Sequence, residues 1–379
     1  MKKSKRIISK LLIVTLIAGM MFAAGCSKKT SSTGDLVVTI NDEKLYMQDM
    51  MYFIFALEAQ GQTNAQYYPG YWDMEVSKGV TVRDQTKQSV MDAAVMWEIL
   101  YLKAKDAKYS LTDDEKKTLK TNVDSVMTSL KEKKEQLELT GFTTENLTTA
   151  LEKLQVAGKY YQSVVDGLNI KEDDVKATID RDKYREYDTE YLLAATTKYE
   201  NSKTVELSDK EKAAAKASID KALTEAKAGK SFADIVKEDS TLTTSTLNFV
   251  KDDQKSPKEY QTAALKLKND GITENIVETS YGYFIIKMKD NNSSASYDTA
   301  VKDAVTKAQD DAFTKKYENE IKKDYKITVN QKVWDKVVMG ETTIPKAERI
   351  TATPTPTTST DATTTPAATD TPAPTKSTK

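Results

Sequence analysis

The pattern of apolar residues changes twice along this chain of 379 residues, and the two changes limit how it can fold. Before residue 187, apolar residues recur at helical spacing, which predicts helices over 85–107, 112–139, 145–168 and 171–184. Residues 187–194 and 283–289 read instead as strands, the second with Phe284, Ile286 and Met288 on one face. Residues 296–323 return to a helical pattern. The chain is therefore predicted to carry a β-α insert within a helical body.

Local signals fix several of the expected helix ends. Thr112 stands three residues before Glu115, and Ser208 stands three before Glu211, which is the spacing of a capping box. Gly229 suits the left-handed residue that ends a helix. Residues 36–40 form a β-rich run, and the apolar run 47–57 predicts either a buried helix or a client-binding one, of which the buried helix is favoured.

These signals predict an α+β fold with several segments. A helical module takes residues 36–186 and 292–340 from the two ends of the chain, and a β-α domain occupies 187–291. Residues 1–25, 26–35 and 341–379 are expected to be a signal peptide, a tether and a disordered tail, respectively.

The N-terminus has the features of an exported chain. A cationic stretch is followed by the apolar residues 11–24, which are too few for a comfortable membrane span. Ala23, Ala24 and Gly25 precede Cys26, and small residues before a cysteine resemble a bacterial lipobox, in which that cysteine is diacylated. Two acyl chains anchor a protein stably. The alternative is an ordinary signal-peptidase cleavage nearby that leaves Cys26 as a free thiol.

The C-terminus is compositionally biased. Residues 351–379 are almost all Thr, Pro, Ala and Ser and hold five of the eight prolines. Such a segment cannot bury a core, so we expect disorder. It is either a spacer that could carry O-glycans or a passive tail.

Composition excludes several kinds of chemistry. The chain has no histidine and one cysteine, Cys26, which removes the usual general base, the usual zinc ligands and any internal disulfide. The formal net charge is −1, with 56 basic and 57 acidic residues, so no basic surface points to nucleic acid. No phosphate-binding loop or nucleophile elbow is present. We therefore expect no metal site, no cofactor and no nucleic-acid partner.

Four stretches carry a resemblance to a known family. Residues 282–287 read Gly-Tyr-Phe-Ile-Ile-Lys, like the parvulin Gly-Tyr-His-Ile-Ile-Lys, and they close a longer similar stretch, 265–287. Residues 229–237, 190–193 and 38–43 match other family stretches less closely. Over 36–338 the chain resembles the PrsA/SurA class of extracytoplasmic foldases. The resemblance implies a SurA-N-like helical chaperone module and a parvulin-like (PpiC-type) prolyl isomerase domain, with unfolded exported polypeptides as clients.

The catalytic residues of that family are replaced here. Its two histidines fall on Tyr191 and Phe284, its Cys/Asp position on Leu242, and its pocket Phe on Leu265. Rotation about an X–Pro bond faces a barrier of about 20 kcal/mol, and placed polar groups are the usual means of lowering such a barrier. The four residues therefore predict a degenerate cleft that binds peptide without catalysis, or else residues that repack the core. Tyr191 retains a hydroxyl that could still orient an amide.

Two aromatic positions outside this domain are further candidates. Tyr71 and Trp72 follow Pro69-Gly70 in a turn-rich stretch, where aromatic side chains can anchor an extended client. They could equally pin the loop to the helical module, which is the favoured alternative. Together with Tyr191 and Phe284 they complete the predicted client-binding set.

Two functions from different classes remain after these steps. The first is a lipid-anchored extracytoplasmic chaperone without isomerase activity, and the second is an active prolyl isomerase with a histidine-free site. A solute-binding lipoprotein would need two lobes of repeated strand–helix units, which the sequence does not show. The oligomeric state and the identity of the clients are left open.

Overall fold

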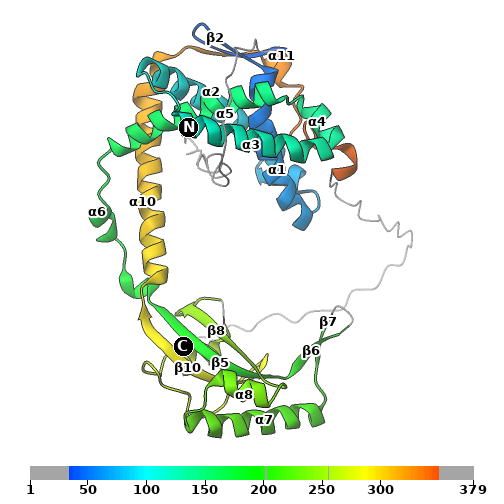
Figure 1. The fold of residues 1–379 in the computed structure, drawn as a ribbon, viewed down its shortest axis with the longest axis vertical. Coiled ribbons are helices and arrows are strands. Elements are labelled where there is room, and N and C mark those ends of the chain that lie inside the picture. The colour runs from blue at the N-terminus through cyan, green and yellow to red at the C-terminus, as the bar shows by residue number, and fades with distance from the viewer. Residues whose placement is uncertain (1–33, 201–202, 255, 350–379) are drawn as a thin grey trace, which may run out of the picture. The chain divides into compact units, whose positions relative to one another are not determined.

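The computed structural model describes residues 34–200, 203–254 and 256–349 (Figure 1). They fall into two compact units: a terminal unit, from 1–160 and 322–379, and a central unit, 161–321. The predicted signal peptide, Cys26, most of the predicted tether and the tail from residue 350 onward lie outside the described residues. The predicted α+β fold class is confirmed.

The terminal unit is mainly helical. Its elements are β1 (Leu36–Ile40), β2 (Glu43–Tyr46), α1 (Met47–Tyr67), η3 (Tyr71–Asp73), β3 (Glu75–Ser77), β4 (Val80–Thr81), α2 (Val82–Asp106), α3 (Asp113–Glu132), α4 (Lys134–Thr140), the start of α5 (Thr144–Asp166), η6 (Lys322–Asp324), β11 (Ile327–Val329), α11 (Gln331–Trp334) and η7 (Lys346–Glu348).

A small antiparallel sheet joins the two ends of the chain in this unit. The strand order is β11-β1-β2, so the N-terminal strand lies between its hairpin partner and a strand almost 300 residues later. Val38 pairs with Val329 in this register, and Val37, Val38 and Ile40 are buried. β-branched residues suit a half-buried pleated surface, which explains why this run forms the central strand.

Helix α1 is a buried helix, as favoured from its apolar run. Met50, Met51, Phe53 and Ile54 are all buried, so this stretch supplies core rather than a client surface. The helix also carries a buried carboxylate, Glu58, which is fully excluded from solvent.

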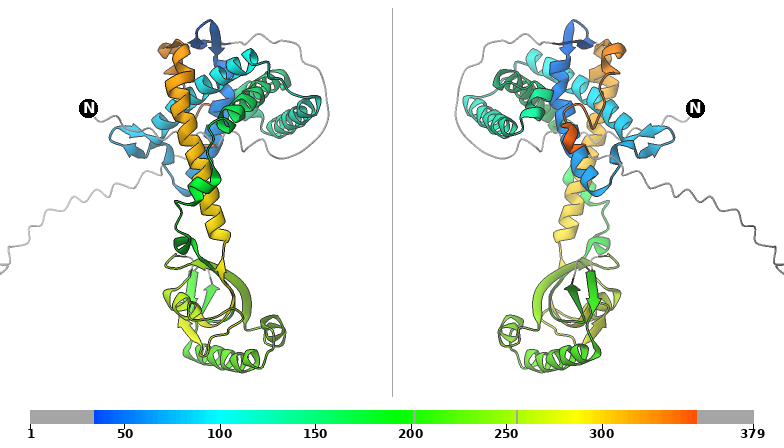
Figure 2. Two further views of the ribbon diagram at one scale, coloured as in Figure 1. Left: turned by 90° about the vertical axis from the view of Figure 1, so that its left-hand side faces the viewer. Right: turned by 90° about the vertical axis from the view of Figure 1, so that its right-hand side faces the viewer.

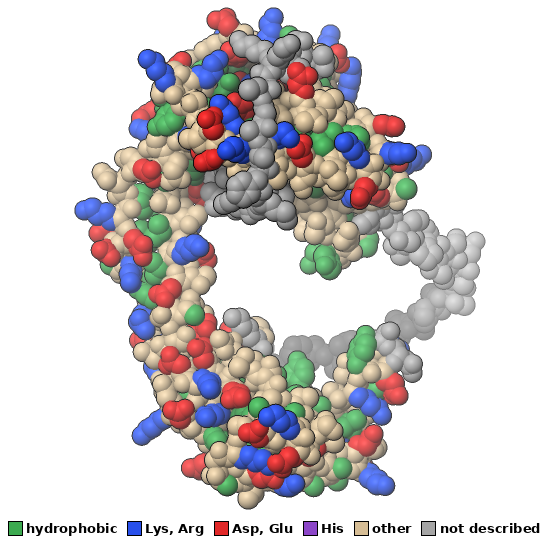
Figure 3. Space-filling view, in the orientation of Figure 1, with side chains coloured by type: hydrophobic (Ala, Val, Ile, Leu, Met, Phe, Trp, Pro, Cys, Tyr) green, Lys and Arg blue, Asp and Glu red, His purple; other side chains and the backbone are tan. Residues whose placement is uncertain are grey.

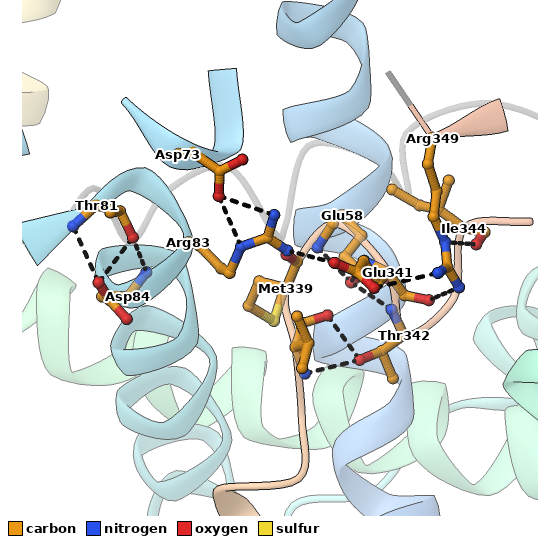
Figure 4. Close-up of polar contacts among 12 residues, drawn as sticks. Glu58, Asp73, Thr81, Arg83, Asp84, Met339, Glu341, Thr342, Ile344 and Arg349 are labelled. Atoms are coloured by element: carbon orange, nitrogen blue, oxygen red, sulfur yellow. Dashed lines mark hydrogen bonds and ion pairs between the residues drawn. The ribbon is translucent and has the colours of Figure 1, made fainter. Parts of the chain in front are cut away.

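Glu58 holds the C-terminal strap, which we define as residues 337–349 (Figure 4). Its Oε1 accepts from the backbone N–H groups of Gly340, Glu341 and Thr342 at 2.6, 3.1 and 3.0 Å. Its Oε2 accepts from the N–H of Thr343 at 2.6 Å and from the hydroxyl of the same residue. Hydrogen bonds to a charged acceptor are about twice as strong as neutral ones, so this carboxylate fastens the strap to α1.

Two arginines support the strap from either side. Arg83 donates to Asp73 Oδ1 and to the carbonyl of Met339, and its Nη1 lies 3.4 Å from Glu341 Oε1. Arg349 pairs with Glu341 Oε2 at 3.1 Å and donates to the carbonyl of the same residue at 2.8 Å.

The strap corrects one predicted boundary. The disordered tail was expected to start at 341, yet Thr343 and Ile344 are buried and η7 spans Lys346–Glu348. Composition gave a wrong start for the disordered tail because the order of residues 341–349 depends on hydrogen bonds to the distant Glu58. The part of the tail beyond 349 stays a prediction.

The central unit contains the second sheet. Its elements are α6 (Glu172–Lys176), η4 (Arg181–Tyr184), β5 (Glu186–Ala195), β6 (Thr197–Glu200), β7 (Lys203–Glu206), α7 (Asp209–Lys227), α8 (Phe232–Glu238), β8 (Thr243–Val250), α9 (Lys258–Ala264), β9 (Val277–Thr279), β10 (Gly282–Ser293), α10 (Ala295–Lys316) and the π-helical η5 (Tyr317–Ile321).

The four-stranded sheet of this unit has the order β8-β5-β10-β9, and its pairs are antiparallel. Helices α7 and α8 cover one face, and α7 lies along the curled sheet in both views of Figure 2. Helix α9 packs on the opposite face through Tyr260 and Ala264. The cores on the two faces are separate, since residues alternate between them along each strand.

The central unit is wider than the predicted insert, 187–291. It also contains α10, which packs against α6 and η4. Tyr297 of α10 is buried beneath the cations of Lys176 and Arg181, at 6.0 and 5.5 Å from its ring centre. A cation over an aromatic face is attractive, which helps to place α10 in this unit.

The predicted helix ends are confirmed where residues cap them. The N–H of Thr112 donates to Glu115 Oε2 at 2.6 Å, and the N–H of Ser208 donates to Glu211 Oε2 at 2.7 Å. Gly229 has a φ of +93°, in the left-handed region that favours glycine.

Replacing Glu58 by alanine is expected to lower the free energy of unfolding of the terminal unit by roughly 3–5 kcal/mol, because four N–H groups lose their acceptor at once. Glu58→Gln keeps the shape and one acceptor oxygen, so its cost should be smaller. Urea unfolding measures the loss, and hydrogen exchange at residues 340–343 locates it. The control is Glu341→Ala, whose half-exposed ion pairs should contribute at most about 1 kcal/mol. Unchanged protection of these amides in Glu58→Ala would contradict the assignment.

Candidate functional site

Alternation along the strands builds the candidate site on the α9 face of the central sheet. Tyr187, Thr189 and Tyr191 of β5 point to this face, while Leu192 and Ala194 belong to the core under α7. The same alternation on β10 sends Phe284, Ile286 and Met288 to the α9 face, as the sequence predicted. β8 adds Leu247 and Phe249.

Five rings on this face make up what we call the aromatic cluster: Tyr187, Tyr191, Phe249, Tyr260 and Phe284. Tyr187 stacks on Phe249 with ring centres 5.4 Å apart. Tyr260 lies edge-on to Phe249, Tyr191 and Phe284, at 6.3, 6.1 and 5.3 Å. Edge-to-face pairs at these separations are attractive beyond the area that they bury. Tyr260 is therefore the centre of the cluster.

The two positions that the resemblance assigns to histidines contact each other directly. The rings of Tyr191 and Phe284 are 5.3 Å apart at 65°. The two rings therefore fill the space in which a degenerate cleft would have an open trough. Phe284 is 6% exposed, whereas Tyr191 is only half-buried.

The other two predicted cleft residues separate. Leu265 packs at the margin of the aromatic cluster and stays half-buried, so it belongs to the same face. Leu242 does not: it is buried with Ile219, Phe232 and Ile235 on the α7–α8 side of the sheet. Of the two interpretations of Leu242, repacking of the core is confirmed and a place in the cleft is wrong, because the turn after α8 carries this residue to the opposite face of the sheet.

One buried hydroxyl pair supplies the polar chemistry within the aromatic cluster. Thr189 Oγ1 lies 2.8 Å from Tyr260 Oη and donates to the carbonyl of Leu247, which makes the tyrosine hydroxyl the donor of the pair. Burial is the largest influence on the pKa of Tyr260 and raises it. Tyr260 therefore stays a neutral phenol at physiological pH.

Arg185 adds a cation at the margin of the aromatic cluster. Its guanidinium lies 5.2 Å from the ring centre of Tyr187, and its Nε donates to the carbonyl of Asn291 at 2.7 Å. The site thus combines aromatic faces, hydroxyls and one fixed cation. Such a surface can bind an extended peptide, but it offers no imidazole or thiol to a twisted amide.

Sequence reasoning missed Tyr260, Phe249 and Tyr187. The two-residue spacing of Tyr187, Thr189 and Tyr191 was a usable signal, since a strand sends all three to one face. Nothing local marked Tyr260, whose part in the site depends on how α9 packs against the sheet.

The predicted aromatic pair of the terminal unit lies on η3. Trp72 is buried, and a Cβ added to Gly61 or Gly340 would come within 2.2 or 2.7 Å of its indole. These close approaches place Trp72 between α1 and the strap, so it pins the loop and offers clients no surface. Tyr71 is half-buried and accepts from Asn64 Nδ2 at 3.1 Å, so its client role stays a prediction.

Surface charge and metal ligands add little to the site. Basic and acidic side chains are interspersed over the face drawn in Figure 3. Within the described ranges, no three acidic, cysteine or histidine side chains lie close enough together to bind a metal ion. A membrane-spanning helix is also not found among the same residues.

The described residues thus form a helical unit from two separate segments of the chain and, inserted between those segments, a unit with a four-stranded sheet. Comparison with known proteins agrees: the family described as rotamase, PPIC-type PPIASE domain, matches residues 193–290. That range contains Leu242, Leu265 and Phe284 and begins two residues after Tyr191. The predicted resemblance to PrsA/SurA-type foldases with a PpiC-type domain is confirmed.

Two relatives carry the name Foldase protein PrsA. The one from Clostridium acetobutylicum is 29% identical over 238 residues, which are 60% of this chain and 66% of the relative. The one from Caldanaerobacter subterraneus subsp. tengcongensis is 25% identical over 105 residues, 28% of this chain and 34% of the relative. The alignments thus span just under two thirds of the first relative and about a third of the second.

Among solved structures, PrsA from Bacillus subtilis is 21% identical to this chain. The match covers 69% of this chain and 86% of the Bacillus subtilis chain. Its TM-score is 0.22, which by itself does not establish a shared overall arrangement.

Truncating Phe284 to alanine is expected to cost the central unit about 3–5 kcal/mol, because a buried ring in contact with two others leaves a cavity. Tyr191→Ala should cost clearly less, because this side chain is already half-exposed. Thermal and urea unfolding of both variants measure the difference. Equal losses would show that Tyr191 is as much a core residue as Phe284 and would remove it from the candidate peptide surface.

Proposed function

We propose that this chain is a lipid-anchored extracytoplasmic foldase that shields exported polypeptides, and that its PpiC-type domain holds peptide without accelerating prolyl isomerisation. The observation that supports the second part is the contact between Tyr191 and Phe284. Aromatic rings in contact occupy the positions where the resemblance expects two hydrogen-bonded histidines. Electrostatic stabilisation is usually the largest catalytic contribution, and this contact provides none.

The chaperone role is supported by the relatives and by the half-buried margin of the aromatic cluster. Tyr191, Leu193, Leu247 and Leu265 each keep part of their apolar surface accessible on one face of the sheet. Aromatic and aliphatic side chains of this kind bind extended chains with little dependence on sequence. Such tolerance suits a protein whose clients are unfolded.

A second candidate function is an active, histidine-free prolyl isomerase, and one observation favours it. Tyr191 is half-buried and carries a hydroxyl at one of the two positions where the resemblance expects histidines. Prolyl isomerisation requires no net proton transfer, so hydroxyls alone could stabilise the twisted amide to some degree.

A protease-coupled assay with a proline peptide separates the two candidates when it is run on the full chain beside suppression of aggregation of an unfolded client. We expect isomerisation to be as slow as in the absence of the chain, with a time constant of tens of seconds at 25 °C. We also expect aggregation of the client to be suppressed. Tyr191→Phe removes the half-buried hydroxyl and keeps the ring, so it is the matched variant. A rate clearly above buffer that falls in Tyr191→Phe would replace the first candidate with the second.

The lipid anchor is a separate proposal that depends on Cys26. Small residues before a lone cysteine, at the end of a short apolar stretch, support diacylation at this position. Metabolic labelling with an alkyne-bearing fatty acid in a bacterial host should label the chain and retain it in the membrane fraction. Cys26→Ser should lose the label. A labelled Cys26→Ser variant, or an unlabelled natural chain, would favour ordinary cleavage instead.

A further inference from the structure

A cavity of about 280 Å³ lies in the terminal unit, and no residue of the aromatic cluster lines it. Its walls come from β2, α1, α2 and α5, with Leu45, Phe53, Trp97 and Leu154 among the apolar side chains. Ligand pockets in proteins usually span about 300–1,000 Å³, so this volume suits one long side chain with its backbone and not a longer segment.

A buried ion pair lies in the wall of this cavity. Lys153 Nζ donates to both carboxylate oxygens of Glu98 at 3.1 Å. The Glu98 side chain is 7% exposed and the Lys153 side chain is 31% exposed, so the carboxylate is the deeper partner. Burial raises the pKa of Glu98 even with Lys153 beside it, which means that one cation does not fully compensate for the lost hydration.

The lining carries an excess of negative charge. Asp49, Glu98 and Glu145 contribute three carboxylates, against the single ammonium of Lys153. Gln48 Nε2 is buried in the same lining and donates to no acceptor among the described residues. A guest that satisfied both features would carry a positive charge and a carbonyl oxygen.

We infer that this cavity receives a lysine or arginine side chain of an extended polypeptide, with the cation at Glu98, the aliphatic stem along the apolar wall and a backbone carbonyl at Gln48. The inference rests on the proposed function, since it names what part of an unfolded client the terminal unit selects. An anionic guest meets the excess of carboxylates, and a purely apolar side chain neither balances that excess nor pairs with the Gln48 amide. The guest is therefore basic.

Fluorescence anisotropy with the full chain and short, labelled, proline-free peptides tests the charge preference. The peptides differ at one central residue, which is arginine, lysine, citrulline or norleucine. Citrulline matches arginine in shape without its charge. We expect the arginine and lysine peptides to bind about 10-fold more tightly than the citrulline peptide, and Glu98→Gln to remove that difference. Equal binding of arginine and citrulline by the natural chain would overturn the inference.

Two further variants distinguish a loss of the charge preference from a loss of folding. Glu138→Gln makes the same charge change at an exposed position on α4 outside the cavity, and it should retain the full preference for arginine. Ala150→Phe fills the cavity from α5 and keeps both Glu98 and Lys153, and it should weaken the binding of the arginine and lysine peptides while the circular dichroism spectrum stays unchanged. A folded Ala150→Phe chain that still binds the arginine peptide at full strength would also overturn the inference.

Suppression of client aggregation separates this inference from the proposed function. If the chain protects a client but binds arginine and citrulline peptides equally, only the inference fails. If the chain neither protects a client nor binds any of the peptides, the proposed function fails and the inference fails with it.

Discussion

A single buried carboxylate completes the terminal unit. Glu58 lies on α1, near the beginning of the chain, and its hydrogen-bond donors lie 282 to 285 residues further on. Leaving several buried N–H groups unsatisfied would cost more than most single packing defects, so the strap and α1 are strongly coupled. The strap in turn covers Trp72, whose indole leaves no room for a side chain at Gly61 or Gly340. Specific hydrogen bonds between α1 and the strap, as well as the β1–β11 pairing, therefore join the two segments of the terminal unit.

The central unit is organised differently. Its α9 face depends on aromatic packing in place of a polar network, with Tyr260 in contact with three other rings. The fold of a PpiC-type domain survives this replacement because the same strand positions point to the same face, whatever side chains they carry. The same strand positions can carry polar side chains that serve catalysis or, as in this chain, aromatic side chains. A match to the PpiC-type domain therefore leaves isomerase activity as a separate question.

The sequence predicted the parts of this arrangement that depend on local rules. The alternation of Phe284, Ile286 and Met288 predicted their shared face, and Thr112 and Ser208 predicted their helix starts, because strand pleat and capping act within a few residues. Leu242 was misplaced because the family pattern gives a position along the chain and not the side of the sheet to which a turn delivers it. The strap was missed for a related reason: residues 341–349 are ordered by a partner almost three hundred residues away. Tyr260 needed the packing of α9 to be known.

Binding and catalysis can be observed together by exchange NMR spectroscopy on one proline-containing peptide with and without the full chain. The central claim is that the aromatic face holds peptide without lowering the barrier to rotation. It predicts shifted and broadened peptide resonances near the aromatic cluster, with no cis–trans exchange peaks beyond those of the free peptide. Exchange peaks that appear only in the presence of the chain would contradict it.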